Sequence, residues 1–310
     1  MQAHWNTKDV DRSHDIRSLC AALEHVVVLP NPKTIGQCMQ AASLIVREDL
    51  DEYEFLSVLG RGGTGMVFLA ERISNREPVV IKMLSPAGGN GLHDSLFSMV
   101  MEMIVSSAEL SLAQHITKHF SCGLSDGRLF LVREYAHNVF ATGSSGPMIT
   151  NHDLAVTMMK YCVTLQAIHN AGYVSRDVVP SNLMESLDRR IVMTDLGSVR
   201  PWRPDVLGAK RMELFLRRCG VSDVAAWLQA SQRHIVRDCI GLGLIFYELA
   251  TGQRINQADR PSRLTPPSKV MPTRSTVFDD VVSRLLDPTH GPDNDPLGSC
   301  RILLRQFSHA

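Results

Sequence analysis

Residues 168–184 of this 310-residue chain read IHNAGYVSRDVVPSNLM, and residues 195–197 read DLG. Asp177 and Asn182 lie five positions apart, and Asp195 follows Asn182 by thirteen. Taken singly, each has an ordinary explanation, because a run such as Asp-Val-Val-Pro is commonly a turn and Asp-Leu-Gly can end a strand. The evidence for a function lies in the order and spacing of several polar residues, and more of these residues occur earlier in the chain.

A glycine-rich segment occupies residues 60–67 and reads GRGGTGMV. Glycine has no Cβ, so the backbone N–H groups of such a segment can approach phosphate oxygens closely. A dinucleotide-binding fold would need a helix directly after the glycines, whereas the strand-like residues 66–70 follow here. A hairpin that covers a phosphate group fits better, and a glycine-rich hairpin without a ligand is the alternative for this motif alone.

A single lysine, Lys82, ends the apolar, strand-like run at residues 79–82, where it could reach nucleotide phosphates. A carboxylate on a following helix would be needed to hold its ammonium group. The helix expected at residues 95–112 offers Glu102 and Glu109. We favour Glu102, because its separation from Lys82 suits one connecting loop and half a helix.

Together these residues resemble protein kinases, and the resemblance extends over roughly residues 53–305. It implies an α+β, bilobal protein-kinase-like fold. The N-lobe would be a small antiparallel sheet with one helix, and the C-lobe would be larger and mostly helical. The resemblance also implies ATP and Mg²⁺ as cofactors.

The resemblance implies a role for each matching position. Asp177 matches the catalytic base, Lys82 and Glu102 would position phosphates, and the metal ligands would be Asn182 and Asp195. Phosphoryl transfer leaves the protein little covalent work, so positioning and charge neutralisation are what such a site supplies. The positions expected to contact the nucleotide are Gly60, Arg61, Gly62, Gly63, Gly65, Val67, Val80, Lys82, Glu134, Ala136 and Met184.

Two more segments carry the resemblance. Residues 130–136, FLVREYA, resemble the strand and hinge between the lobes, where the backbone of Glu134 and Ala136 would meet adenine. Residues 238–252 resemble the buried helix whose aspartate, Asp238, braces the catalytic loop. Small-molecule kinases rarely share that helix, so this segment favours a protein kinase.

Several positions depart from the family pattern. Ser175 stands where a histidine usually packs the catalytic loop, and Val179 replaces a lysine that steadies the transferred phosphate, although Pro180 is typical of the serine/threonine branch. Val80 adds methyl groups above the adenine, and Arg133 puts a large cation at the gatekeeper position beside the back pocket. The hypothesis that follows is a weakened or altered nucleotide affinity.

Residues 197–237 lack the Ala-Pro-Glu that usually anchors the substrate-binding loop, and residues 225–227 lie nearest to that place. The arginine that usually pairs with this glutamate is absent around residues 294–296, so we expect an unorthodox mode of substrate docking. Basic residues outnumber acidic ones in the segment, which indicates a solvated face or, with Arg176, a surface that receives a phosphate or an acidic partner. The basic residues are Arg200, Arg203, Lys210, Arg211, Arg217 and Arg218.

The composition is that of an ordinary globular protein, with 44% hydrophobic and 21% charged residues. Its 32 basic and 32 acidic side chains give a formal charge of zero, so we expect neither a nucleic-acid partner nor a membrane. The polar N-terminus does not resemble a secretory signal, and the apolar run at residues 240–249 is too short for a membrane span. These features predict a cytoplasmic protein, with the nucleus as an alternative.

The seven cysteines are widely spaced and form no Cys-x-x-Cys pair, which predicts reduced and mostly buried thiols. His115 and His119 lie four positions apart and could share a helix face. No third ligand is near, so a surface or core role is favoured over a zinc site.

The chain divides into an N-terminal extension at residues 1–50, an ATP-binding N-lobe at 51–137, and a C-lobe at 138–310 with the catalytic loop and activation segment. The elements expected are three antiparallel strands within 53–84, a helix at 95–112, a strand at 129–132, and helices at 153–170 and 238–251.

The function expected is transfer of the ATP γ-phosphate to serine or threonine of a protein substrate. The alternative is a pseudokinase, a nucleotide-binding or scaffolding module that regulates a partner protein. The retained polar positions favour the enzyme, whereas Ser175, Val179 and the missing anchor favour the module. A kinase acting on small molecules is the third reading.

Overall fold

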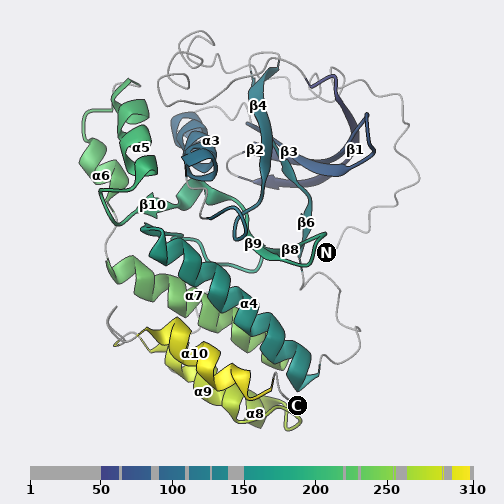
Figure 1. Cartoon of the computed structure of the whole chain (residues 1–310), viewed down its shortest axis with the longest axis vertical. Helices are drawn as coiled ribbons and strands as arrows, with labels where there is room; N and C mark the ends of the chain where they lie inside the picture. Colours follow the sequence, from purple (N-terminus) through teal and green to yellow (C-terminus); the bar gives the residue numbers. More distant parts are fainter. Residues whose placement is uncertain are drawn as a thin grey trace.

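The computed structural model describes residues 50–62, 65–84, 91–108, 112–125, 128–138, 150–218, 221–229, 232–253, 255, 264–287, 289 and 295–307. A lobe built on a twisted sheet stands above a lobe of packed helices (Figure 1). The bilobal α+β fold expected from the sequence is therefore confirmed. The expected extension at residues 1–50 lies outside the described residues except for Leu50.

The upper lobe contains a five-stranded antiparallel sheet of order β1-β2-β3-β5-β4. Its strands are β1 (Tyr53–Gly62), β2 (Gly65–Arg72), β3 (Pro78–Leu84), β4 (His119–Ser125) and β5 (Arg128–Glu134). The strands expected within 53–84 and at 129–132 are confirmed, whereas β4 was not anticipated. Alternation along β3 puts Val79, Ile81 and Met83 in the apolar cluster on one face, so Val80 and Lys82 project to the other.

The prediction that His115 and His119 could share a helix face is wrong. His115 lies in a turn, and His119 begins β4, opposite Arg133 of β5. A helix cannot form here because the segment pairs along the edge of the sheet. The His119 side chain instead contacts the hydroxyl of Ser106 on the neighbouring helix.

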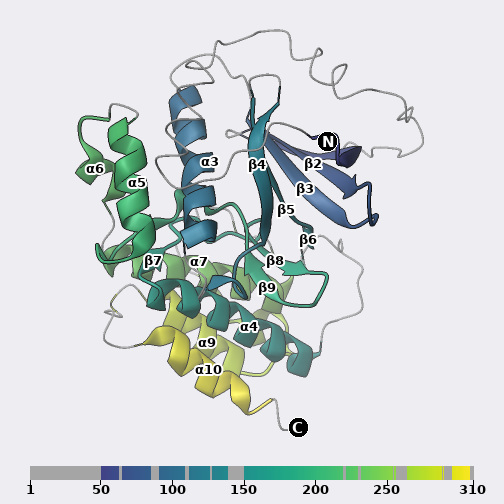
Figure 2. The same ribbon diagram turned by 45° about the horizontal axis from the view of Figure 1, so that its top comes forward.

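That helix, α3 (Gly91–Ala108), packs beside the sheet (Figure 2). It begins four residues before the expected start at Ser95. Its buried face is continuous with the core of the lower lobe, since Met99, Val100 and Ile104 are fully buried in the same cluster as the lower helices. This helix therefore connects the two lobes through apolar contacts as well as through its polar side chains.

The lower lobe is built around two long helices, α4 (Asn151–Asn170) and α7 (Gln232–Thr251), which cross one another and lie above the shorter helices (Figure 1). Both expected helices are confirmed, and α7 begins six residues earlier than predicted. The shorter helices are α8 (Pro267–Val270), α9 (Val277–Leu286) and α10 (Pro296–Arg305). None of the helices in the described ranges has the length and apolarity needed to cross a membrane.

Short strands join the lobes and frame the loop between residues 175 and 182. They are β6 (Ala136–His137), β7 (Tyr173–Val174), β8 (Leu183–Ser186), β9 (Ile191–Met193) and β10 (Arg200–Pro201). The strand β6, which leaves the upper sheet, pairs with β8 and so fixes the connection between the lobes. The loop itself is held between β7 and β8.

The segment after residue 197 forms a 3₁₀ turn, η2 (Leu196–Ser198), and then two helices, α5 (Leu207–Arg218) and α6 (Val224–Leu228). Helix α5 lies alongside α3 in both views (Figures 1 and 2). The ring of Phe97 on α3 makes edge contacts with Phe215 and Trp227, at centroid distances of 5.7 and 5.1 Å. The segment thus packs against the helix that carries Glu102.

Candidate active site

Lys82 is the centre of a buried ionic cluster. Its Nζ lies 3.0 Å from Oε2 of Glu102 on α3 and 2.7 Å from Oδ1 of Asp195, which precedes η2. Lys82 and Glu102 are 2% and 0% exposed, and the Asp195 side chain is 38% exposed. Three segments far apart in sequence therefore meet at one ammonium group. The competing choice for the lysine partner, Glu109, lies outside the described residues.

The charged groups of this cluster stabilise one another's ionised forms. Burial alone would lower the pKa of Lys82, but the carboxylates of Glu102 and Asp195 keep that pKa above its ordinary value. Burial would likewise raise the pKa of Glu102, but the ammonium group of Lys82 holds it well below its usual range. Both groups are therefore ionised at neutral pH.

Asp177 and Asn182 form a second cluster in the loop before β8. The Asn182 Nδ2 donates to the Asp177 carbonyl at 3.1 Å and to Asp177 Oδ2 at 2.9 Å. Both partners are acceptors, so the orientation of the amide is fixed and its Oδ1 faces the other way. Burial raises the pKa of Asp177, as do the charges of Asp195 and Asp238, against the effect of the Asn182 hydrogen bond.

The sheet geometry brings Asp195 to this second cluster. Leu183 pairs with Met193 across β8 and β9, and the Thr194 N–H donates to the Asn182 carbonyl at 2.8 Å. The next residue, Asp195, has a left-handed backbone with φ of 52°. Its carboxylate pairs with Lys82 and acts electrostatically on Asp177, so all five polar positions singled out in the sequence are linked to one another.

Asp238 on α7 anchors the loop that carries Asp177. Its carboxylate accepts from the N–H groups of Ser175 and Arg176, each at 2.8 Å, and its Oδ2 lies 2.9 Å from Nε2 of His169. The Ser175 hydroxyl in turn accepts from the Asp177 N–H at 3.4 Å. The loop is thus held through its backbone, although serine replaces the usual histidine. His169 was missed because only the folded chain brings α4 and α7 together.

The glycine segment forms the expected hairpin, with Gly62 paired to Gly65. A Cβ added to Gly60 would meet no atom within 4 Å, so open space lies beside this residue. Gly65 has a φ of 152°, which side-chain-bearing residues rarely adopt. Arg61 is exposed on β1, whereas Gly63 lies outside the described residues.

Val67 and Val80 share the sheet face of Lys82. Val67 is the cross-strand partner of Lys82, and side chains of cross-strand partners project to the same face. Met184, on β8 of the lower lobe, is partly buried. Val67 and Val80 thus lie on the sheet face that carries Lys82, and Met184 lies on a strand of the lower lobe.

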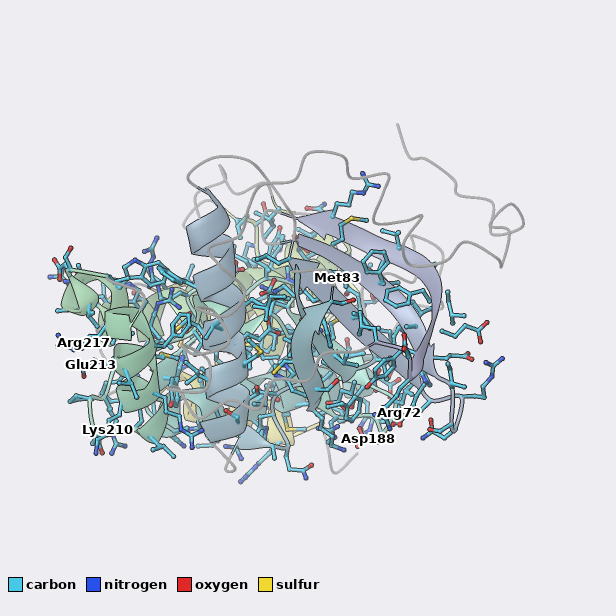
Figure 3. The ribbon with its side chains drawn as sticks, turned by 90° about the horizontal axis from the view of Figure 1, so that it is seen from above. Arg72, Met83, Asp188, Lys210, Glu213 and Arg217 are labelled. Carbon is cyan, nitrogen blue, oxygen red and sulfur yellow. The ribbon has the colours of Figure 1, made fainter. Side chains whose placement is uncertain are left out.

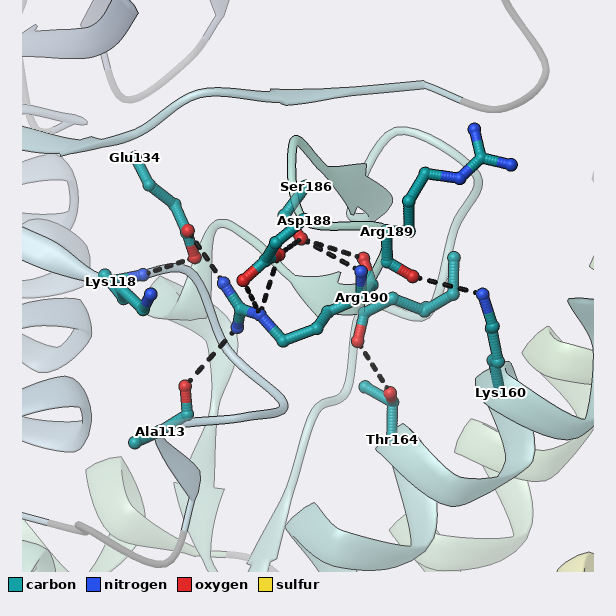
Figure 4. A network of polar contacts seen from close by, with 10 residues as sticks. Ala113, Lys118, Glu134, Lys160, Thr164, Ser186, Asp188, Arg189 and Arg190 are labelled. Atoms are coloured by element: carbon teal, nitrogen blue, oxygen red, sulfur yellow. Dashed lines mark hydrogen bonds and ion pairs between the residues drawn. The ribbon is translucent and has the colours of Figure 1, made fainter. Parts of the chain in front are cut away.

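Glu134 is held by its side chain in a polar network at the connection between the lobes (Figure 4). Its carboxylate accepts from the Lys118 N–H at 2.8 Å and from Arg190 Nη2 at 2.9 Å. Arg190 also pairs with Asp188 in the turn between β8 and β9. Ala136 follows on β6, opposite Ser186. The network ties the end of the upper sheet to the lower lobe.

The prediction of a basic surface at residues 200–218 is wrong in part. Arg200 is buried, donates to the carbonyls of Gly197 and Val199 at 2.8 Å, and stacks over Trp227. Burial, then the charge of Arg176, lowers its pKa to about 10. The sequence could not distinguish this internal brace from a surface cation.

Two of the exposed arginines in that segment are ion-paired. Arg203 pairs with Asp205, and Arg217 pairs with Glu213 along α5, on the side of the molecule away from the sheet (Figure 3). Lys210 lies on the same helix, and the Arg218 side chain lies outside the described residues. Of the two alternatives, a solvated face and a surface that receives a phosphate or an acidic partner, this arrangement corresponds to the solvated face.

The residues present fit a magnesium nucleotide. The Asp195 carboxylate and the Asn182 Oδ1, which also accepts from the Ser181 hydroxyl at 3.4 Å, are the hard oxygen ligands that Mg²⁺ prefers, and the Lys82 ammonium suits phosphate. The described residues contain no group of three or more His, Cys, Asp or Glu side chains arranged for a metal. Phosphate oxygens and water would therefore have to complete the coordination.

A separate cavity of about 290 Å³ lies in the lower lobe, away from these residues. Its lining comes from α4, α7, α9 and α10 and includes Gln166, Trp202 and Arg284. Since none of the five polar positions lines it, this cavity is not the site described above.

The antiparallel-sheet lobe and the helical lobe, joined by the ion pairs of Lys82, have the fold of the protein kinase class. A family model described as the protein kinase domain matches residues 53–274. The chain belongs to the protein kinase family.

Several known proteins are similar to this chain. Serine/threonine-protein kinase D of Synechocystis sp. is 33% identical over 158 residues, covering 49% of this chain and 31% of that protein. Ribosomal protein S6 kinase alpha-3 of Homo sapiens is 24% identical over 213 residues, covering 66% of this chain and 27% of that protein. The matched region thus spans about a third or less of these relatives.

A solved structure supports the fold. The kinase domain of Mycobacterium tuberculosis PknI aligns with a TM-score of 0.52 at 20% identity, covering 86% of this chain and 98% of that one. At this identity the likeness concerns the fold and not the substrate.

Proposed function

We infer that the chain is an ATP- and Mg²⁺-dependent kinase that transfers the γ-phosphate to serine or threonine of a protein. The observation that carries this proposal is the double pairing of Lys82, at 3.0 Å to Glu102 and 2.7 Å to Asp195. It joins the two lobes at the place where Asp177 and Asn182 also lie. The serine/threonine kinases among the relatives support the class of hydroxyl.

Each side chain has a defined task in this proposal. Lys82, held by Glu102, binds phosphate oxygens, while Asn182 and Asp195 hold Mg²⁺, which when bound neutralises phosphate charge. Asp177 accepts or orients the proton of the attacking hydroxyl, and burial raises the pKa of its carboxyl group, which makes it a better proton acceptor. The Asn182 amide keeps this carboxylate aimed through its 2.9 Å hydrogen bond.

The experiment is transfer of radiolabelled phosphate from ATP to generic protein substrates in the presence of Mg²⁺. The control is Asp177→Asn, which keeps an oxygen for the Asn182 amide and so preserves the shape of the loop. We expect incorporation by the wild type and a loss of at least about 100-fold in the variant. Equal incorporation by both proteins would remove Asp177 from the mechanism.

The second candidate is a pseudokinase that regulates a partner protein. It is favoured by the segment after residue 197, in which no Ala-Pro-Glu anchor occurs and α5 packs against α3 through Phe97 and Phe215. Val179 also supplies no charge near the transferred phosphate. If neither the wild type nor Asp177→Asn transfers phosphate while both bind Mg²⁺ and nucleotide, the module is the better description.

We further propose a cytoplasmic location and a protein partner, either a substrate or a regulated protein. The location is supported by Cys162, Cys239 and Cys300, which are buried free thiols suited to a reducing compartment. The zero formal charge argues against nucleic acid as the partner. The division into an ATP-binding lobe at 51–137 and a catalytic lobe at 138–310 belongs to the same proposal.

A further inference from the structure

A serine and a histidine lie directly behind the Lys82–Glu102 pair. Ser106 follows Glu102 by four positions on α3, so both side chains lie on the same face of that helix. His119 begins β4, the edge strand that runs beside α3 (Figure 2). In the ring of His119, Nδ1 contacts the Ser106 hydroxyl, and Nε2 lies 3.6 Å from Oε1 of Glu102. Four side chains therefore form one continuous chain that ends at the ammonium group of Lys82.

The Glu102 carboxylate uses only one of its oxygens for the lysine. Oε2 contacts Lys82 at 3.0 Å, whereas Oε1 and the facing Nε2 of His119 have no hydrogen-bond partner within the described residues. The side chains of His119 and Glu102 are 11% and 0% exposed, so water has little access to this contact. At 3.6 Å the two atoms are farther apart than in an ordinary hydrogen bond, but close enough to act on each other electrostatically. The sign of that interaction depends on which ring nitrogen carries the proton.

The surroundings of the Ser106 hydroxyl determine which nitrogen that is. The hydroxyl has one proton and three possible acceptors, which are the carbonyls of Glu102 at 3.0 Å and Met103 at 3.1 Å, and Nδ1 of His119. Both carbonyls already accept N–H groups of the helix, so they do not need the serine proton. A ring proton on Nδ1 alone would turn the lone pair of Nε2 toward the ionised Glu102 carboxylate, which is repulsive. A serine proton donated to Nδ1 leaves the ring proton on Nε2, where it faces Oε1.

We propose that His119 is a positioning residue, whose Nε2–H holds the Oε1 side of the Glu102 carboxylate so that Oε2 stays on Lys82. Ser106 orients the ring for this task. The inference rests on the proposed function, in which Lys82 binds phosphate oxygens. Asp195, the other partner of Lys82, is a proposed Mg²⁺ ligand, so Glu102 is the partner of this lysine that has no second task. The restraint on Glu102 therefore sets where the ammonium group meets the nucleotide.

The first experiment locates the ring proton in the ligand-free protein at neutral pH. Imidazole ¹⁵N chemical shifts distinguish a nitrogen that carries a proton from one that does not, and the spectrum of His119→Phe identifies the signals of this ring. We expect a proton on Nε2 of His119 in the wild type. A bare Nε2 in the wild type would overturn the inference, because the ring would then repel the Glu102 carboxylate.

The second experiment measures the effect of the ring on the nucleotide. His119→Phe keeps the ring and removes both nitrogens. We expect the dissociation constant of Mg²⁺·ADP, measured by calorimetry, and the KM for Mg²⁺·ATP to rise about fivefold, in the range of one hydrogen bond. The KM for the protein substrate should stay unchanged, because Lys82 acts on phosphate oxygens. His119→Gln, which keeps an N–H donor, should recover part of the nucleotide affinity.

The chain offers a matched control for each side chain. His137 faces Glu185 at 3.5 Å in the same kind of pair but away from the ionic cluster, so His137→Phe should leave the nucleotide constants unchanged. Ser107 directly follows Ser106 on α3, and its hydroxyl donates to the Ile104 carbonyl at 3.2 Å. Ser107→Ala should likewise have no effect on nucleotide binding. Melting curves verify that every variant is folded.

A double-variant cycle tests the serine and the histidine as one unit. Ser106→Ala should weaken nucleotide binding about as much as His119→Phe, and the double variant should add nothing, since the hydroxyl acts only through the ring. Fully additive effects, an unchanged dissociation constant in His119→Phe, or a rise in the KM for the protein substrate alone would overturn the inference. If the wild type binds no nucleotide, the proposed function fails and the positioning role fails with it. A bare Nε2 in a protein that does bind nucleotide overturns the positioning role alone.

Discussion

The two oxygens of Glu102 face regions of opposite character. On the side of Oε2, Lys82 and Asp195 complete an ionic cluster in which every charge has a partner at 3.0 Å or less. On the side of Oε1, the Nε2 of His119 lies 3.6 Å away, and the nitrogens Nε and Nη1 of Arg133 have no hydrogen-bond partner within the described residues. The Glu102 carboxylate thus separates a paired region, in which every charge has a partner, from an open region, in which buried polar atoms lack hydrogen-bond partners.

This difference separates side chains whose interactions stabilise the fold from side chains whose burial costs free energy. Buried ions that are paired hold the two lobes together, because removing either partner leaves an uncompensated charge. Buried polar atoms without hydrogen-bond partners cost free energy, because they lose water and gain no partner. The first region should therefore respond to mutation with large losses, and the second with small losses or gains.

The largest effect is expected from breaking the paired region with Lys82→Met. The buried carboxylate of Glu102 would lose its ammonium partner, so we expect a loss of about 3–5 kcal/mol in the free energy of unfolding. Phosphate transfer should fall below detection. Chemical denaturation and the transfer assay measure both effects. Lys118→Met, which removes an exposed lysine side chain directly before β4, is the control, and a similar loss there would contradict the assignment.

Much of the paired region could be predicted from the sequence. Asp177, Asn182 and Asp195 lie within nineteen residues, where spacing alone restricts their positions. Lys82 and Glu102 are distant from them, and only the resemblance to protein kinases placed them together. The strand β4 escaped prediction because HFSCGLS carries few β-branched residues, and its pairing with β5 decides its conformation.

The open region could not be predicted at all. Whether Arg133 or His119 finds a partner depends on side chains brought in by other strands and by α3, and no local pattern reports this. The same reason explains Arg200, which was expected on the surface but is buried and stacks over Trp227. A charged residue in a sequence reveals its chemistry but not its surroundings.

An intermediate effect is expected from the pH dependence of Glu102→Gln. The folded protein holds the pKa of Glu102 below its usual range, so its charge contributes stability that is present above the unfolded pKa, near 4.3. As the pH falls below that value, the difference in free energy of unfolding between wild type and variant should shrink by about 1.4 kcal/mol per pH unit. It should be level between pH 6 and 9, where Lys82 stays protonated.

The control for this titration is Glu213→Gln, which removes an exposed carboxylate paired with Arg217 on α5. Its difference from wild type should stay within about 0.5 kcal/mol across the range. A Glu102→Gln difference that grows toward low pH would mean that burial, and not Lys82, governs this carboxyl group.

The smallest effect compares two buried threonines, one with a hydrogen-bond partner and one without. The Thr164 hydroxyl donates to the Ile191 carbonyl at 2.8 Å, whereas Oγ1 of Thr117 has no partner in the described ranges. Thr164→Val should therefore lose about 1 kcal/mol of unfolding free energy, and Thr117→Val should gain up to about 1 kcal/mol. Denaturant titration resolves the two signs, and equal losses would show that Thr117 is satisfied by water.

The central claim is that side chains of both lobes hold one magnesium nucleotide at Lys82, Asn182 and Asp195. Its most direct test is the affinity for nucleotide measured with Mg²⁺ and with excess chelator, in the wild type and in Asp195→Asn. The account predicts a wild-type affinity that falls at least about tenfold when Mg²⁺ is removed, and a variant that binds weakly and equally under both conditions. A wild-type affinity independent of Mg²⁺, or a variant that keeps the full metal dependence, would contradict it.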